Sequence, residues 1–333
     1  VEVWSGAMPE TLMFGNFWDV LIEVFKYEDV NSNGVYDEGD VPLGDWMFEI
    51  SGPGVTNPVA YTDVYGFAYF WVNRAGTYII TEEDRAGWTH VNPADGDLDI
   101  DVASGDRPKP LMFGNFEDVM IIIFKFDDRY ADGQYCPAEG DVPIEGWVFE
   151  LYLWVEDDWV LVATGMTDSD GYVEFVLTQA GTYKVLEVVQ TGWFIILPIG
   201  GNYVVEVFSG DEPIWLYFAN FKLGKIYGYK WNDLNGNGMW DEGEPGLPGW
   251  TIYFECWFWY GDVLYYLHGF DVTDEGGYYE FTGLPPGIYV VWEDLELMPG
   301  WIPTSPPEVE VEVIGHTEAR VDLPPPEGAT ISM

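Results

Sequence analysis

Three lysines recur at one position of a repeated pattern, where they could act as nucleophiles. The chain has only seven lysines, and Lys26, Lys125 and Lys230 each follow an apolar stretch with the composition of a strand. Because alternate residues of a strand share a face, Lys26 lies on the face of Ile22 and Val24. The sequence therefore predicts three ammonium groups that point into the protein interior.

A glutamate and an asparagine are predicted to face these lysines. In three later strand-like segments, a glutamate shares a face with the tyrosine four residues before it, and two closing segments carry an inward asparagine. The residues concerned are Glu82, Glu187, Glu293, Asn115 and Asn220. Lysine, glutamate and asparagine would then meet in a buried set in each of the first two copies, Lys26 with Asn115 and Lys125 with Asn220.

Such a set can form an isopeptide bond by itself, without the help of an enzyme. Desolvation lowers the pKa of the amine and raises that of the carboxyl, so a neutral lysine attacks the amide while the protonated glutamate moves protons. Ammonia is released. The alternative is a buried Lys–Glu ion pair with the asparagine as a hydrogen-bonding neighbour.

The third copy lacks the closing asparagine. Its final strand-like segment, residues 319–323, offers only Asp322, which alternation places on the outward face. Lys230, with Glu293 beside it, is therefore expected either to stay unlinked or to meet Asn16 of another chain.

Two loops carry the oxygen pattern of an EF-hand-type calcium loop. Oxygen ligands at positions 1, 3, 5, 9 and 12, a carbonyl at position 7 and a glycine at position 6 suit a hard cation that takes six to eight oxygens. The first loop offers Asp29, Asn31, Asn33, Asp37 and Asp40 with the Val35 carbonyl, and the third offers Asp233, Asn235, Asn237, Asp241 and Glu244 with the Met239 carbonyl. The sequence predicts Ca2+ as a cofactor. The alternative is a polar turn without metal.

The second copy of this loop is predicted to be weak or empty. It retains Asp128, Asp132 and Glu139, but Tyr130 and Cys136 stand at two positions that carry oxygen side chains in the other loops. Chelation should therefore lower the stability of the first and third copies more than that of the second.

These residues belong to three repeats of about 100 residues each. Short alternating segments with frequent glycine and proline predict an all-β protein of three tandem immunoglobulin-like sandwiches. The predicted ranges are 18–116, 117–221 and 222–323, followed by a proline-rich tail at 324–333. Because almost no linker separates the copies, the sandwiches are expected to form a rod.

Residues 1–17 look like the last hairpin of another such domain. Residues 12–17 repeat the closing segment 111–116, yet they precede the first copy. A lone hairpin is marginal by itself, so this one is predicted to add strands to a neighbouring chain, head to tail, and to build a homopolymeric filament. The alternative is a sequence cut from a longer array.

Composition excludes several partners. A formal charge of −46 disfavours nucleic acid and anionic membranes, and no apolar stretch is long enough to span a bilayer. Three scattered histidines give no catalytic arrangement, so no enzyme is predicted. Strands that are apolar on both faces suggest cover by another subunit. Exposed aromatic residues could instead stack on carbohydrate, and the candidates are Trp257, Trp259, Tyr260 and Tyr265.

Two sequence stretches resemble known surface proteins. Residues 224–238 and 241–250 resemble the calcium-binding B-type repeats of bacterial Sdr-like and related archaeal cell-surface proteins, and residues 183–193 are similar to Cna B-type collagen-adhesin domains, some of which carry Lys–Asn isopeptide bonds. The resemblance implies a prealbumin-type immunoglobulin-like fold, an extracellular location, calcium in the first loop and a stalk or fibre role. The weak second loop and the missing third asparagine depart from it.

The sequence as a whole predicts an extracellular structural subunit of a filament or surface layer. Ca2+ and isopeptide bonds would stiffen it, and its main partner would be a second copy of itself. The alternative is a stalk, or a carbohydrate-binding and adhesive module, of a larger cell-surface protein.

Overall fold

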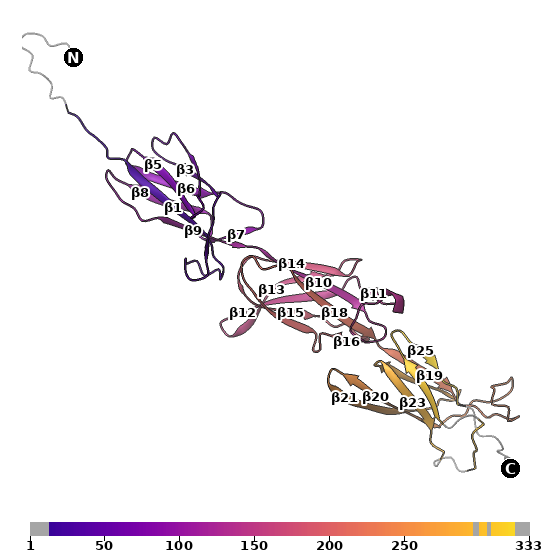
Figure 1. Cartoon of the computed structure of the whole chain (residues 1–333). Helices are drawn as coiled ribbons and strands as arrows, with labels where there is room; N and C mark the ends of the chain where they lie inside the picture. The colour runs from indigo at the N-terminus through magenta and orange to yellow at the C-terminus, as the bar shows by residue number, and fades with distance from the viewer. Residues whose placement is uncertain (1–12, 296–299, 305–307, 324–333) are drawn as a thin grey trace, which may run out of the picture. The chain divides into compact units, whose positions relative to one another are not determined.

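The computed structural model describes residues 13–295, 300–304 and 308–323. Over these ranges the chain forms β-strands joined by turns, with one short 3-10 helix at Pro137–Glu139 (Figure 1). None of the helices within them is long and apolar enough to cross a membrane. The chain divides into two compact units, one of which contains the described residues up to Met120 together with Val176–Thr182 and Glu206–Pro213.

The first repeat forms two sheets. Its strands are β1 (Val20–Glu28), β2 (Val41–Pro42), β3 (Met47–Ser51), β4 (Val59–Tyr61), β5 (Phe67–Val72), β6 (Gly76–Glu82), β7 (Trp88–Asn92), β8 (Asp97–Val102) and β9 (Leu111–Glu117). One sheet has the order β2-β1-β9-β7 with β5 also on β1, and the other has the order β4-β3-β6-β8. The pairing of β1 with β9 is parallel, whereas the pairings of β1 with β2 and β5, of β3 with β4 and β6, of β6 with β8 and of β7 with β9 are antiparallel.

The second repeat has the same plan. Its strands are β10 (Val119–Asp127), β11 (Val142–Pro143), β12 (Val148–Val155), β13 (Asp158–Met166), β14 (Tyr172–Leu177), β15 (Gly181–Glu187), β16 (Trp193–Leu197), β17 (Asn202–Val207) and β18 (Ile214–Lys222). The sheets have the orders β11-β10-β18-β16, with β14 on β10, and β13-β12-β15-β17. Here too the first and closing strands, β10 and β18, pair in parallel.

In the third repeat the ladder between the first and the closing strand is shorter. The strands of this repeat are β19 (Gly224–Tyr229), β20 (Thr251–Tyr260), β21 (Val263–Val272), β22 (Tyr278–Leu284), β23 (Gly287–Glu293), β24 (Glu308–Val313) and β25 (Glu318–Arg320). The sheets have the orders β22-β19-β25 and β21-β20-β23-β24. The parallel ladder between β19 and β25 covers three residue pairs, compared with seven between β10 and β18.

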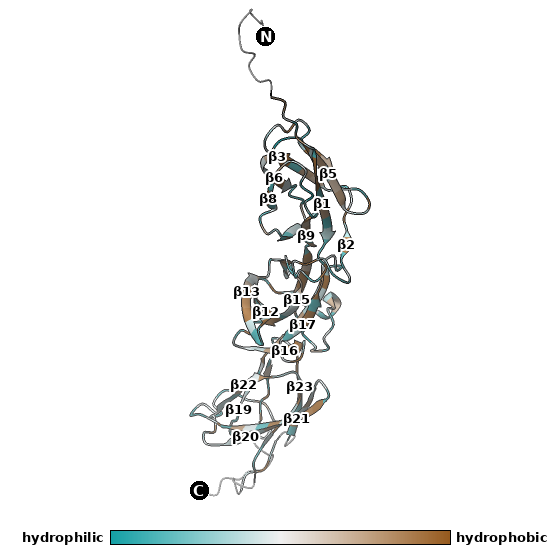
Figure 2. Cartoon of the chain, turned by 90° about the vertical axis from the view of Figure 1, so that its left-hand side faces the viewer, coloured by the Kyte–Doolittle hydropathy of each residue, from teal (hydrophilic) through white to brown (hydrophobic). Residues whose placement is uncertain are grey.

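Alternating apolar side chains build the interior of each sandwich. Burial alternates along the strand Phe67–Val72, because successive side chains of a strand point to opposite faces, and Figure 2 shows teal and brown stretches mixed along the strands. Phe48 and Phe113 join the two sheets of the first repeat with ring centroids 4.9 Å apart. Phe149 and Phe218 do the same in the second repeat at 4.7 Å.

The chain itself covers the outer face of β10. Ile122 and Phe124 lie on the face opposite Lys125, yet they are only 9% and 5% exposed. The rings of Tyr135 and Tyr172 each lie 4.9 Å from that of Phe124. The expectation that strands with two apolar faces need cover from another subunit is therefore wrong for β10.

The predicted all-β sandwich architecture is confirmed. Each predicted domain range contains one pair of sheets, except that β9 and β18 each end one residue later. Most of the predicted hairpin 1–17 and the whole tail 324–333 lie outside the described residues. Residues 13–17 form no strand, and Met13 and Phe14 are each 90% exposed.

Candidate functional site

Hydrogen bonds on both backbone groups fix the position of each buried lysine. The Lys26 N–H donates to the Gly66 carbonyl at 2.8 Å, and the Lys26 carbonyl accepts from the Leu43 N–H at 3.0 Å. The equivalent bonds run from Lys125 to Gly171, from Ile144 to Lys125, from Lys230 to Gly277 and from Leu247 to Lys230. All three lysines are fully buried.

The glycine of this arrangement has a clear steric requirement. Gly66 has φ of 84°, in the left-handed region, and a Cβ there would lie 2.4 Å from the Lys26 carbonyl oxygen. Gly171 and Gly277 have φ of 81° and 79°, and a Cβ would lie 2.6 Å and 2.0 Å from the corresponding lysine oxygens. The repeated Thr-Asp-x-x-Gly motif therefore holds the lysine strand in place.

A threonine and a tryptophan form another wall around the lysine. Thr62 Oγ1 donates to the Leu43 carbonyl at 2.7 Å and accepts from the Trp46 N–H at 2.9 Å. The Trp46 ring centroid then lies 4.6 Å from Lys26 Nζ. The same contacts recur at Thr167 with Trp147 and at Thr273 with Trp250, whose rings lie 4.5 Å from the lysine nitrogens. The tryptophans are absent from the predicted site, although their spacing follows the repeat.

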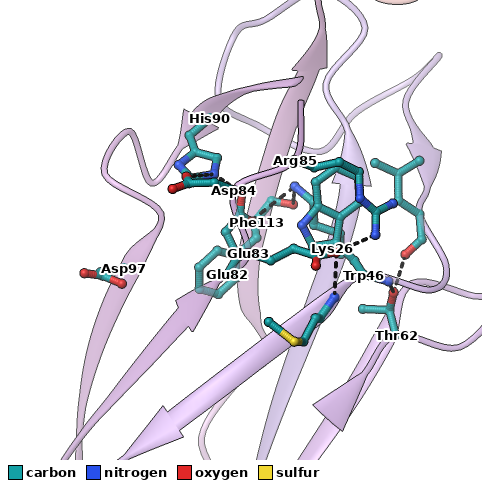
Figure 3. A network of polar contacts seen from close by, with 12 residues as sticks. Lys26, Trp46, Thr62, Glu82, Glu83, Asp84, Arg85, His90, Asp97 and Phe113 are labelled. Atoms are coloured by element: carbon teal, nitrogen blue, oxygen red, sulfur yellow. Dashed lines mark hydrogen bonds and ion pairs between the residues drawn. The ribbon is translucent and has the colours of Figure 1, made fainter. Parts of the chain in front are cut away.

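Lys26 and Glu82 form an ion pair that joins the two sheets of the first sandwich (Figure 3). Lys26 Nζ lies 3.3 Å from Glu82 Oε2, and neither side chain is more than 1% exposed. Burial lowers the pKa of Lys26 to about 8, although Glu82 opposes that shift, and burial also raises the pKa of Glu82. Both shifts favour the neutral forms, which an attack by the amine on an amide requires.

The other two sandwiches repeat this pair. Lys125 Nζ lies 3.0 Å from Glu187 Oε2, and Lys230 Nζ lies 2.7 Å from Glu293 Oε2. Burial lowers the pKa of Lys125 to about 8 and also lowers that of Lys230. It raises the pKa of both glutamates. The three predicted Lys–Glu sets therefore come together in space.

Asn115 completes the first set, and Asn220 holds the same place in the second. The parallel register puts Phe113 opposite Lys26, and Asn115 follows two residues later on the same face. Both asparagines are at most 1% exposed, and each side chain contacts the glutamate of its set, Asn115 with Glu82 and Asn220 with Glu187. Burial dominates the pKa of Glu82, but contacts with Lys26 and Asn115 oppose it.

His90 distinguishes the first set from the second. Its Nε2 lies 2.8 Å from Glu82 Oε1 (Figure 3). His90 stands opposite Asn115 in the pairing of β7 with β9, and Ile195 stands opposite Asn220 in the pairing of β16 with β18. The sequence pattern did not predict this contact, because it depends on which residues of two separate strands face each other.

The third set has no asparagine among the described residues. Lys230 stands opposite Leu323. The two asparagines follow the residue opposite their lysine by two positions, so the matching position here is residue 325, a proline outside the described residues. Asp322 faces outward as alternation predicts and accepts from Arg320 Nε at 3.0 Å. It does not take the place of the asparagine.

The two loops that carry every predicted oxygen ligand share one hydrogen-bond pattern. Asp29 accepts from the N–H groups of Asn33 and Gly34 at 3.0 and 2.7 Å, and the Asn33 amide reaches Asp37 at 2.7 Å. Asn31 reaches the same carboxylate at 3.4 Å. The third loop repeats these contacts with Asp233, Asn235, Asn237, Gly238 and Asp241.

The last acid of each complete loop binds both of its ends. Asp40 accepts from the N–H groups of Val30 and Asp37, each at 2.9 Å. Glu244 accepts from those of Leu234 and Asp241, also at 2.9 Å. The predicted first and last ligands are therefore held at the two ends of each loop.

In the second loop this role belongs to Asp141. It accepts from the Cys136 N–H at 2.8 Å, whereas the predicted Glu139 lies exposed in the 3-10 helix. The loop is longer by two residues after Cys136, so counting from its start selects the wrong acid. The shared motif Gly-Asp-Val-Pro, at 39–42 and 140–143, identifies Asp141 from the sequence. Asp128 and Asp132 keep their expected places within the loop.

The donor atoms of loops 29–40 and 233–244 fit a hard cation in type and spacing. Both offer carboxylate and amide oxygens at alternate positions, and the side chains at positions 3, 5 and 9 converge. In the parts of the chain that the structure describes, no group of three or more His, Cys, Asp or Glu side chains is placed to hold a metal. A cation there would depend on the asparagines and the main-chain oxygens.

The predicted carbohydrate residues lie on the hairpin of β20 and β21. Trp257, Trp259 and Tyr265 are 58%, 69% and 44% exposed. Phe258 stands opposite Tyr265 in the register, so Tyr260 and Tyr265 lie on one face while Trp257 and Trp259 lie on the other. The four residues therefore do not form one platform.

The sequence resembles surface proteins of staphylococci. Residues 224–305 match the family model described as SdrD B-like domain. The chain is 25% identical over 324 residues to serine-aspartate repeat-containing protein D of Staphylococcus aureus (strain Newman), which covers 90% of this chain and 23% of that protein. It is 21% identical over 289 residues to serine-aspartate repeat-containing protein F of Staphylococcus epidermidis (strain ATCC 12228 / FDA PCI 1200), with 80% and 17% covered. The predicted resemblance to Sdr-like repeats is confirmed, and the chain spans less than a quarter of these relatives.

Solved structures show weaker similarity. The Bacillus anthracis TIE protein aligns with 94% of this chain and 51% of its own, at 20% identity and a TM-score of 0.37. A streptococcal ancillary pilin aligns with 92% and 98%, at 12% identity and a TM-score of 0.33.

Proposed function

We propose that the chain is a structural segment of an extracellular surface protein, closed covalently in its first two sandwiches. The observation that carries the proposal is a pair of buried asparagines, each in contact with the glutamate of a buried Lys–Glu pair. The similarity to serine-aspartate repeat proteins supports the surface location. No enzymatic role is proposed.

The isopeptide bond forms by amide exchange. Neutral Lys26 Nζ attacks Asn115 Cγ, and protonated Glu82 donates a proton to the amide oxygen. A C–N bond to lysine forms, the bond from Cγ to Nδ2 breaks, and the nitrogen leaves as ammonia with the proton that lysine gives up through Glu82. The proton on the oxygen returns to Glu82 as the carbonyl forms again. Lys125, Glu187 and Asn220 take the same roles in the second sandwich.

Calcium is proposed to hold the first and third loops. The oxygens at positions 1, 3, 5, 7, 9 and 12 of loops 29–40 and 233–244 would bind it. Bound calcium would neutralise part of a chain whose formal charge is −46. The second loop keeps its fold through Asp141 and binds calcium weakly or not at all.

Assembly is proposed to be head to tail, by addition of the segment 1–17 to a second copy. The described part of that segment pairs with no strand and exposes Met13 and Phe14. The second candidate function is a stalk or adhesive module of a larger surface protein. It is favoured by the small fraction of each relative that the chain spans and by the exposed Trp257 and Trp259.

Intact mass under denaturing conditions tests the proposal. The chain is expected to be lighter than its sequence mass by two ammonia molecules, and by one in Asn115→Ala or in Asn220→Ala after allowance for the substitution. The exposed Asn73→Ala is the control and keeps both losses. An unshifted mass would rule out the covalent proposal, and negative-stain images separate fibres from isolated segments.

A further inference from the structure

The third sandwich keeps the reactive pair and lacks its partner. Lys230 and Glu293 are at most 1% exposed in their side chains and lie 2.7 Å apart, as close as the pairs that have an asparagine. In the first sandwich, the Asp29 N–H donates to the Asn115 carbonyl at 2.8 Å.

The sequence after Leu323 cannot supply what is missing. Residues 324–326 are three prolines, which have no N–H for a strand ladder and no side-chain amide. The described closing ladder ends with the Leu323 N–H, which donates to the Tyr229 carbonyl at 3.0 Å. The edge of the sheet beyond Lys230 is therefore left to another strand.

We propose that this strand is residues 13–17 of a second copy, and that Asn16 of that copy becomes linked to Lys230. The inference rests on the isopeptide chemistry proposed above and extends it from within a chain to between chains. It makes the third sandwich an acceptor and the leading segment a donor.

The sequence of the segment is the main argument for this occupant. Residues 12–17 are identical to residues 111–116, which form the closing strand of the first sandwich. In that strand Phe113 and Asn115 are at most 1% exposed, whereas their counterparts Phe14 and Asn16 are exposed. A segment that fills this position in one sandwich has the side chains to fill it in another.

Strand exchange in the third sandwich gains apolar burial. The chain's own closing residues there are Val321 and Leu323, which are 4% and 1% exposed. In the register of the first sandwich, Phe14 replaces Leu323 and Asn16 lies two residues further on, beside Lys230. The five donor residues align with positions 322–326, so Gly15, Asn16 and Phe17 would stand where the chain's own sequence has three prolines. Phe14 is larger than Leu323 and would bury more apolar area at that position.

The covalent step balances without an added reagent. Lys230 Nζ bonds to Asn16 Cγ, the bond from Cγ to Nδ2 breaks, and Glu293 carries the proton from lysine to the departing nitrogen, which leaves as ammonia. Each link joins two chains and removes the mass of one ammonia.

Two complementary variants test the link. Asn16→Ala leaves only an acceptor, and Lys230→Met leaves only a donor. Wild-type protein is expected to run as a covalent ladder on a denaturing gel, each variant alone as a monomer, and an equal mixture of the two as a single covalent dimer. Even if Lys230→Met disturbs the third sandwich, that chain can still donate its segment 13–17. The control is Asn73→Ala at an exposed site, which is expected to keep the ladder.

The outcomes separate this inference from the function on which it rests. A wild-type monomer band that shows both intramolecular ammonia losses overturns the inter-chain link alone. A monomer with no loss of mass overturns the isopeptide chemistry itself. Fragment masses in which the peptide with Asn16 is joined to the one with Lys230, less one ammonia, support the link.

Discussion

The second and third sandwiches each keep one of two features, a complete Lys–Glu–Asn set or a loop with all the predicted cation ligands. The second has the asparagine beside its buried lysine, but its loop has Tyr130 and Cys136 in place of oxygen ligands. The third has a loop with every expected ligand, but no asparagine beside Lys230 among the described residues. The first sandwich has both.

This difference teaches that the lysine set and the loop are independent although they are neighbours in the sequence. Lys125 lies near the end of β10 and Asp128 directly follows that strand, and Lys230 and Asp233 have the same spacing just after β19. The set or the loop can therefore be lost without disturbing the backbone that supports the other. In both sandwiches the lysine N–H donates to the glycine carbonyl and the lysine nitrogen lies over the tryptophan ring. The threonine accepts from the N–H of that tryptophan.

Removal of the proposed covalent link should give the largest effect. Asn220→Ala is expected to lower the free energy of unfolding of the second sandwich by about 4–5 kcal/mol, by analogy with a cross-link that closes a loop of roughly 100 residues. Asn202→Ala is the control, because it loses only one exposed hydrogen bond, to the Gly200 carbonyl. Urea unfolding followed by hydrogen exchange of this sandwich measures both, and equal losses would contradict the prediction.

Replacement of the buried Lys–Glu pair by apolar residues should change the stability of the second and third sandwiches differently. In an Asn16→Ala background, Lys230→Met with Glu293→Leu is expected to leave stability unchanged or to raise it by about 1–4 kcal/mol, whereas Lys230→Met alone costs about 3–5 kcal/mol. The same double change at Lys125 and Glu187 also removes the link, so its effect on stability is expected to be less favourable than that of the third-sandwich double variant by about 4–5 kcal/mol. Thermal unfolding of the four variants checks this, and matching losses in the two double variants would refute it.

A pH series should reveal whether the lysine of the second sandwich is free. Burial lowers the pKa of Lys125 to about 8 from an ordinary 10.5, so between these values the unfolded chain binds more protons than the folded one. The stability of unlinked Asn220→Ala should therefore rise with pH through this window, by at most about 3 kcal/mol. In the linked protein the amide nitrogen does not titrate and the rise is absent. Urea midpoints from pH 8 to 10.5 measure it, and parallel curves would contradict the link.

Removal of calcium should give the smallest effect on stability. Here the third sandwich is expected to respond and the second is not. A ligand at a hundred times its Kd stabilises by about 2.7 kcal/mol, so a chelator is expected to cost the first and third sandwiches about 2–3 kcal/mol and the second almost nothing. Hydrogen exchange resolves the three in one sample. Asp233→Asn should abolish the response of the third sandwich only, and equal responses in all three would contradict the loop assignment.

Strand periodicity carried most of what the sequence could predict. The inward positions of Lys26, Glu82 and Asn115 follow from alternation within single strands, since a period of two leaves no freedom. The sequence pattern selected Glu139 as the last acid of the second loop, whereas the structure has Asp141 there. A two-residue insertion moves the end of this loop relative to its start.

Contacts between strands were less predictable. The place of His90 opposite Asn115 and that of Trp46 above Lys26 depend on register and on how two sheets face each other. The position equivalent to Asn115 in the third sandwich is residue 325, outside the predicted closing segment 319–323, because Lys230 pairs with Leu323. Alternation fixes a side chain's face but not its neighbour on another strand.

The parallel pairing of first and closing strands has a mechanical consequence. The chain enters the first sandwich through β1 and leaves it through the adjacent β9, so a pull on the two ends would load all hydrogen bonds of that ladder at once, in shear. With Lys26 joined to Asn115, tension would pass from β1 to β9 through one amide. The residues between them would carry none of it, and the sandwich could not be stretched while its backbone remained intact.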